Sequence, residues 1–272
     1  MDFLYAEDPF SIFLFIVVTI VLFILALNIL LGIIGLLMDR EQVYLIKGMV
    51  PGNTSRIIQV NPSITGSIPI DRSDNKTGIE FSWSVWINVS EMNTSNSNYV
   101  HVFNKGEQSF AESGLNTPNN SPGVYLKYNS GADTSTTTGS GQCELHVLMN
   151  TYSTASSYYE EIVVPNLPIS KWVNVIIRVT NKEFAVYING TLAKQHKLLD
   201  VPRQNYGTVN VGSNGGFNGN LSDLVYYSYA LSPGKIVAIN KRGPNLKVNS
   251  NAASLSYGKN YLSTQWYSNN LQ

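Results

Sequence analysis

The sequence predicts an all-β domain, folded as a jelly-roll sandwich of two antiparallel sheets and preceded by one transmembrane helix. Three observations support this: a 29-residue run without charge near the N-terminus, short apolar segments of period two along the rest of the chain, and turn signals between them. They divide the chain into a short acidic N-terminus (1–9), a membrane helix (10–38), a connector (39–56), the sandwich (57–243) and a C-terminal tail that contains aromatic residues (244–272).

The uncharged run extends from Phe10 to Met38, and 22 of its residues are Leu, Ile, Val or Phe. As a helix it reaches roughly 43 Å, more than the roughly 30 Å hydrocarbon core of a bilayer. A cleaved signal peptide is the alternative, but it has a basic leader, whereas this leader carries Asp2, Glu7 and Asp8. We therefore expect a membrane anchor in contact with a lipid bilayer, with the side chains of Phe10, Phe13, Val17, Leu22, Leu30 and Met38.

The distribution of charge predicts the side of the membrane and excludes one class of partner. No Lys or Arg precedes the run, whereas Arg40, Lys47 and Arg56 follow it, so the positive-inside rule places the large domain on the cytoplasmic side. The single cysteine, Cys143, rules out an internal disulfide and agrees with a reducing compartment. Basic and acidic residues number 18 each, which leaves no basic excess for nucleic acid.

The first strong strand pattern begins at Ile79 and has period two. One face of it holds Phe81, Trp83, Val85, Ile87 and Val89, and the other holds Ser82, Ser84, Trp86, Asn88 and Ser90. Such alternation is typical of a half-buried antiparallel strand. Further strands are expected around residues 57–60, 100–103, 124–128, 145–149, 162–164, 172–180, 184–188, 191–193, 208–211 and 221–229.

The links between strands carry their own signals. Asn189-Gly190 suits a two-residue type I′ turn, because both of its central positions need positive φ. Ser232-Pro233 predicts the start of a short helix that stops at Gly243-Pro244. Residues 129–142 are a Ser, Thr and Gly insertion, for which we expect a mobile surface loop.

The order of motifs over residues 57–243 resembles the concanavalin A-like, laminin-G-like jelly roll. The residues that carry the resemblance are Gly78 to Trp86, Phe103-Asn104-Lys105-Gly106, Trp172 to Val175, Val186 to Gly190, Asn210-Val211-Gly212, Phe217 to Asp223 and Tyr229 to Ser232. The resemblance implies a fold used for glycan binding, protein binding, glucan hydrolysis or assembly, and it does not choose among these.

No catalytic, cofactor or metal motif stands out, and we expect a protein that is not an enzyme. Glucan hydrolysis needs paired carboxylates on one strand face, but Glu160 and Glu161 are adjacent and point to opposite faces. Cys143 and His146 also point to opposite faces of a strand, and two residues are too few ligands for a zinc ion. Asp223 and the loop at Asn214 are the candidates for a calcium site, and a turn explains them better.

Two sets of aromatic residues remain as candidates for contacts. Trp86 shares a face with serines, so it is either a platform for a glycan or a side chain that packs beneath a second layer. The tail keeps four aromatics in a polar stretch, which predicts docking on this domain or on a neighbour. These four candidate partner contacts are Tyr257, Tyr261, Trp266 and Tyr267.

Two hypotheses for the function follow from this organisation. A membrane anchor followed by a neutral jelly roll resembles the membrane-tethered minor capsid proteins of large icosahedral DNA viruses. That resemblance implies a structural protein of the virion that links an internal membrane to the surrounding shell and has capsid or membrane proteins as neighbours. The alternative is a membrane-anchored, lectin-like surface protein that binds carbohydrate; an inactive relic of a glucanase differs little from it in sequence.

Overall fold

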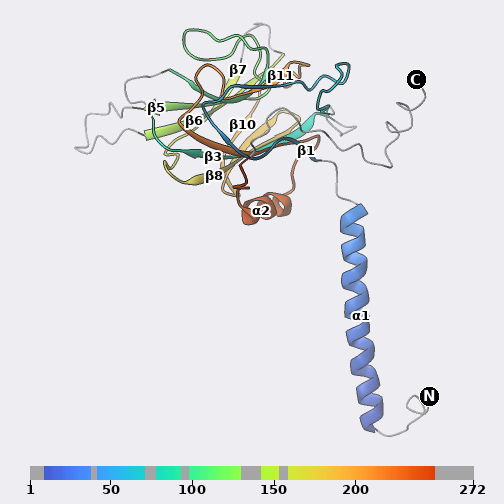
Figure 1. Ribbon diagram of the computed structural model, residues 1–272. Helices are drawn as coiled ribbons and strands as arrows, with labels where there is room; N and C mark the ends of the chain where they lie inside the picture. The colour runs from blue at the N-terminus through green and yellow to red at the C-terminus, as the bar shows by residue number, and fades with distance from the viewer. Residues whose placement is uncertain are drawn as a thin grey trace. The chain divides into compact units, whose positions relative to one another are not determined.

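The structure is a computed structural model that describes residues 9–37, 42–70, 78–92, 98–129, 142–152 and 159–248. The chain divides into two units, one that contains the N-terminal helix and one that contains the β domain (Figure 1). Among the described residues, those of the first unit form only the helix and none of them belongs to the buried core, whereas the described strands lie in the second unit.

Helix α1 (Pro9–Leu37) is long and apolar enough to cross a membrane, with a mean hydropathy of 3.1 over Ile12–Leu31. Its polar side chains bond within the helix, because Thr19 donates to the carbonyl of Phe15 and Asn28 donates to that of Ile24. Asn28 therefore has a partner in its own helix. Of the predicted anchor residues, Phe10, Phe13, Val17, Leu22 and Leu30 are exposed on α1, and Met38 lies outside the described residues.

The β domain is a sandwich of two antiparallel six-stranded sheets, as predicted. The first sheet contains, in spatial order, β1 (Gln42–Pro51), β12 (Gly219–Tyr227), β3 (Glu80–Val89), β8 (Trp172–Thr180), β9 (Glu183–Ile188) and β10 (Thr191–Lys197). The second sheet contains β2 (Arg56–Ile58), β11 (Thr208–Val211), β4 (Val100–Gly106), β5 (Gly123–Asn129), β6 (Gln142–Asn150) and β7 (Tyr159–Val164).

The core lies between the sheets and follows the period of the strands. The five β3 residues that the sequence places on one face, Phe81 to Val89 in steps of two, all belong to it. On β6 the core residues are Cys143, Leu145, Val147 and Met149. Because side chains alternate across a strand, the residues between them point to the outer face of the second sheet.

The outer face of the first sheet is covered by helix α2 (Pro233–Arg242), as Figure 1 shows. Ile236 and Ile239 of this helix pack on a second apolar cluster with Ile176 and Tyr227 of the sheet. Ser232 caps the helix and Gly243 ends it, which confirms the boundaries expected from sequence. Helix α2 thus covers part of the outer face of the first sheet, whereas β10 at the edge of that sheet stays exposed.

The edges of the sandwich correct one boundary. Residues 42–51, expected to lie in a connector, form β1 and pair with β12. Lys47 and Gly48 interrupt the apolar pattern of this stretch and so hid an edge strand whose inner positions, such as Leu45 and Val50, are buried. On the far side of β1 the amide of Met49 donates to the carbonyl of Lys247, so the start of the predicted tail is held against the domain.

The predicted hairpin is confirmed. β9 and β10 are joined by Asn189 and Gly190 alone, and both have positive φ, 49° and 81°. The Ser, Thr and Gly insertion lies outside the described residues from 130 to 141. The four predicted contact aromatics of the tail lie outside the described residues as well.

Replacing Gly190 by Ala should lower the free energy of unfolding by about 1 to 2 kcal/mol, because a Cβ strains a backbone with positive φ. Gly234→Ala is the matched control: this glycine lies in α2 with nothing within 4 Å of a built Cβ. It should raise the free energy of unfolding by about 0.5 to 1 kcal/mol. Urea unfolding measures the free energy of unfolding of both variants relative to the wild type. Equal changes in the two variants would contradict the turn geometry.

Candidate functional site

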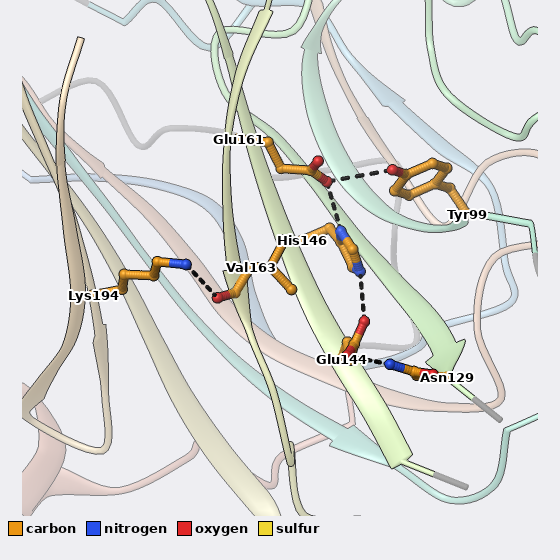
Figure 2. A network of polar contacts seen from close by, with 7 residues as sticks. All are labelled: Tyr99, Asn129, Glu144, His146, Glu161, Val163 and Lys194. Carbon is orange, nitrogen blue, oxygen red and sulfur yellow. Dashed lines mark hydrogen bonds and ion pairs between the residues drawn. The ribbon is translucent and has the colours of Figure 1, made fainter. Parts of the chain in front are cut away.

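The outer face of the second sheet carries a chain of ionisable and aromatic side chains (Figure 2). His146 on β6 lies between two carboxylates: its Nδ1 is 2.5 Å from Oε1 of Glu161 on β7, and its Nε2 is 3.3 Å from Oε2 of Glu144. Glu144 and His146 share this face because they are two residues apart on one strand. Asn129 donates to the other oxygen of Glu144 at 2.8 Å.

Tyr99 links this network to the end of the sandwich. Its hydroxyl lies 3.4 Å from Oε1 of Glu161, and its ring meets the ring of His146 edge-on at 5.2 Å. Burial, followed by the nearby charge of Glu161, raises the pKa of Tyr99 to about 12. Tyr99 therefore stays protonated near neutral pH and acts as a hydrogen-bond donor.

The network does not form the open carboxylate pair that glycoside hydrolysis uses. In retaining and inverting glycosidases the two carboxyl groups flank the space that the sugar occupies. Here the imidazole of His146 occupies the space between Glu144 and Glu161, as Figure 2 shows. The neighbouring Glu160 points the other way, as predicted, and its carboxylate lies 2.6 Å from Nε2 of His196 across the edge between β7 and β10.

The candidate metal ligands lie apart. Cys143 is in the core and His146 is on the outer face, as the sequence predicts, and burial raises the pKa of the Cys143 thiol to about 12. Asp223 accepts a hydrogen bond from the amide of Gly48 at 2.7 Å and so holds an irregular stretch of β1 against β12. Across the described ranges, no three His, Cys, Asp or Glu side chains form a group suited to a metal ion.

A groove of about 730 Å³ opens at the rim next to Tyr99. It lies at the end of the sandwich where β3 and β11 finish and where β4 and β12 begin. Its walls present amide, carboxylate and aromatic groups, among them Asn53, Glu91, Tyr99, Glu112, Asn214 and Asn218. Several of these residues are held in place: Asn98 donates to the carbonyl of Glu112 at 3.0 Å, and Asn218 donates to the carboxylate of Glu91.

The glycines at residues 212–216 shape one wall of this rim groove. Gly216 has φ of 56°, and a Cβ there would lie 2.2 Å from the carbonyl oxygen of Gly52. A side chain at Gly216 would therefore push the two loops apart. The same wall is fixed at its start by His101, whose Nδ1 accepts a hydrogen bond from the amide of Ser213 at 3.0 Å.

His101 is a buried, neutral residue with a structural role. Because Nδ1 is an acceptor, Nε2 carries the proton and donates to Oδ1 of Asn104 at 2.9 Å. Burial lowers the pKa of His101 to about 4. Protonation of Nδ1 would break the bond to Ser213, so the wall of the rim groove depends on the neutral ring.

The sequence found only part of this site. Trp86 is 7% exposed on the outer face of the first sheet, opposite Ser222 and Asn174, which favours packing over a glycan platform. The network and the rim groove were missed, because they join residues far apart in the chain. The Glu144-x-His146 spacing was the one local signal, since it puts both side chains on one strand face.

The chain belongs to the concanavalin A-like lectin/glucanases superfamily, whose model matches residues 63–237. This agrees with the resemblance that the motifs indicated over residues 57–243. A comparison with curated proteins found no match. The family defines a lectin-like jelly roll that serves binding and hydrolysis alike, so the function has to be argued from the site.

Solved structures with a similar fold include toxin binding domains and a pentraxin. The binding domain of botulinum neurotoxin serotype D is 14% identical with a TM-score of 0.45, covering 74% of this chain and 52% of that one. Botulinum neurotoxin type C, whose cell entry depends on two ganglioside molecules, is 15% identical with a TM-score of 0.42, covering 62% and 36%. The heptameric SAP-like pentraxin from Limulus polyphemus is 14% identical with a TM-score of 0.42, covering 76% and 85%.

The stability of the domain should fall as the pH drops from about 6.5 to about 4. The unfolded chain binds a proton at His101 in this window and the folded chain does not, so this contribution to stability is complete above the window and is lost within it, at up to about 1.4 kcal/mol per pH unit. Urea unfolding at several pH values measures the slope. His101→Asn keeps an acceptor near Ser213 without a titrating ring and should flatten the slope, and an unchanged slope would contradict this role.

Proposed function

We propose that this chain is a membrane-anchored, lectin-like protein that binds a carbohydrate in its rim groove and does not cleave it. The observation that carries the proposal is the composition of the rim groove. Amide and carboxylate groups such as those of Asn214 and Glu112 match the mixed donors and acceptors of sugar hydroxyls, and Met92 lines the groove beside them with an apolar side chain.

Hydrogen bonds hold several of the described wall residues of the rim groove in place, which reduces the entropy that binding must overcome. Asn218 orients Glu91, Asn98 bonds to the Glu112 main chain, and His101 holds the start of the glycine wall. A rigid wall of this kind supports recognition of one ligand geometry.

Two features support binding without catalysis. Glu144 and Glu161 are already occupied by His146, Asn129 and Tyr99. Glu91 and Glu112 in the rim groove come from loops, whereas the hydrolytic pattern expected from sequence needs carboxylates on one strand face. We therefore assign the acidic groups of the rim groove to hydrogen bonding.

The apolar helix α1 supports an anchor in this proposal. A signal sequence near the N-terminus can also be apolar enough to pass as a membrane span, so the anchor is tested by the mass of the mature chain, which should retain residues 10–38. The orientation inferred from Arg40, Lys47 and Arg56 places the β domain on the cytoplasmic side. Protease added to sealed vesicles tests this orientation: an intact domain agrees with the cytoplasmic side, and a digested domain lies outside, as a surface lectin requires.

Asn218→Ala should weaken glycan binding by about five- to tenfold, because it removes one amide and releases Glu91. The full chain in lipid nanodiscs is first screened on an array of neutral and acidic glycans. The dissociation constant of the best glycan is then measured by calorimetry. Asn240→Ala, on α2 away from the rim groove, is the matched control and should bind like the wild type.

Two results would overturn this function. One is an array without any bound glycan, and the other is release of reducing sugar from a bound oligosaccharide by the wild-type chain. The second result would make Glu91 and Glu112 the first residues to replace, since both line the rim groove.

A second candidate function is a structural one, in which the domain links a membrane to a surrounding protein shell, as in minor capsid proteins. It is favoured by exposed apolar side chains on three neighbouring segments: Tyr152 (60% exposed), Tyr159 (38%) and Leu199 (71%). These segments are joined by bonds from the amide of Tyr152 to Val201 and from the amide of Leu199 to Glu160. The residues form an apolar patch suited to a protein neighbour, and the tail aromatics Tyr257, Tyr261, Trp266 and Tyr267 are proposed as further contacts.

A cross-linking experiment tests this structural role. Leu199→Cys carrying a thiol-linked photo-cross-linker should form adducts with neighbouring proteins in the native membrane or particle. Val237→Cys on α2, also exposed, is the control and should form few. The natural Cys143 is buried and will not be labelled. Equal adducts from both positions, or none from Leu199→Cys, would contradict the structural role.

A further inference from the structure

Five cations of the β domain come from β1, from α2 and from the residues that directly follow α2. They are Lys47, Lys235, Lys241, Arg242 and Lys247. The segments that carry them, residues 42–51 and 233–248, contain no Asp or Glu. We name the surface formed by Lys47, Lys241, Arg242 and Lys247 the basic face.

Contacts with β1 bring the two ends of the β domain together at the basic face. The hydroxyl of Tyr44 accepts a hydrogen bond from Nη1 of Arg242 at 3.3 Å, and Nζ of Lys47 lies 5.9 Å from the centre of the same ring. At the outer edge of β1, the amide of Met49 donates to the carbonyl of Lys247 at 2.8 Å. Segments far apart in the chain therefore place their cations on one surface.

The cations of the basic face reach solvent, and apolar side chains lie beside them. Lys47, Lys241, Arg242 and Lys247 are all exposed. On the same segments Val237 is 45% exposed, Leu246 58% and Val248 70%. Exposed apolar side chains bordered by Lys and Arg are typical of segments that lie in the interface of a bilayer.

Nearby acidic groups do not cancel the charge of the basic face. On β12, which pairs with β1, the one acidic side chain is that of Asp223. Its carboxylate accepts hydrogen bonds from the amide of Gly48 at 2.7 Å and from the side chain of Asn245 at 3.5 Å. Residues 38–41, which precede β1, carry two acidic side chains and one Arg. Positive charge is therefore in excess on this side of the domain.

The chain connects β1 directly to the apolar helix. Residues 38–41 alone separate α1 from β1. A fully extended chain advances at most about 3.6 Å per residue, so the five steps from Leu37 to Gln42 reach at most roughly 18 Å. This link is short enough to keep the β domain at the surface of a bilayer that α1 enters. Cytoplasmic leaflets carry anionic lipids, which attract Lys and Arg close to a membrane span.

We propose that the basic face docks the β domain on anionic phospholipid headgroups of the bilayer that α1 enters. This inference rests on the membrane anchor of the proposed function and is independent of what the rim groove binds. Each cation held near an anionic leaflet strengthens the attachment roughly fivefold. Salt weakens the attachment, because it screens charges that lie at a surface.

Fluorescence quenching tests the docking with the full chain in lipid nanodiscs. A dye on Val237→Cys, one helical turn before Lys241, reports on the basic face, and nitroxide groups on the lipid headgroups quench it on contact; the natural Cys143 is buried and stays unlabelled. Quenching should be strong in discs with roughly 30% phosphatidylserine, weak in discs of phosphatidylcholine, and lost in about 0.5 M salt. A dye on Leu192→Cys of β10, also exposed, should remain unquenched.

Two variants with the same change in charge test the cations. The docking constant, the ratio of docked to free domain, is obtained from the quenching as the fraction of anionic lipid rises. Replacing Lys241 and Lys247 by Gln should lower it roughly 25-fold, since two cations are lost. Replacing Lys194 and Lys197 by Gln removes the same charge from β10 and should leave it unchanged.

Three results contradict the docking. They are equal quenching in anionic and neutral discs, a variant of Lys241 and Lys247 that docks like the wild type, and equal quenching of the dyes at positions 237 and 192. Protein adducts at Val237→Cys in the cross-linking experiment would assign the basic face to a protein partner instead.

Retention in the disc separates this failure from failure of the anchor. A chain that leaves neutral discs in high salt overturns the anchor and, with it, the docking. A chain that stays in the disc with an unquenched dye overturns the docking alone.

Discussion

The burial of alternate side chains between two sheets is the constraint on which the rest of the β domain depends. Phe81, Trp83 and Val85 of β3 face Val102, Val124 and Val147 of the second sheet within one apolar core, and the residues between them are forced outward. The outer faces then differ. Helix α2 covers part of the outer face of the first sheet, and the outer face of the second sheet carries Tyr99, His146 and Glu161.

The same strands define both ends of the sandwich, yet the ends have opposite chemistry. At one end the loops hold glycines, amides and carboxylates around the rim groove, where close backbone contacts such as Gly216 against Gly52 leave no room for side chains. At the other end large inner-face rings do not fill the space between the sheets.

The polar network on the second sheet shows why residue types alone do not define an activity. Two glutamates, a histidine and a tyrosine lie together, the inventory of many hydrolases. In this arrangement each carboxylate is held by a neighbour, His146 separates them, and burial keeps Tyr99 protonated. The groups rigidify the sheet beside the rim groove, and this is consistent with a role in holding a binding site.

The sequence by itself determined the apolar helix, the strands with their inner faces, the Asn189-Gly190 turn and the capped helix after Ser232, because each depends on residues close together in the chain. It also predicted that the side chains of Glu160 and Glu161 point to opposite faces of their strand, because this alternation depends only on neighbouring residues. Only the tertiary structure decided that residues 42–51 join the first sheet, that Tyr99 meets Glu161, and that His101 holds the amide of Ser213. The physical reason is that strand order, loop approach and cavity shape depend on contacts between residues distant in sequence, which no local pattern records.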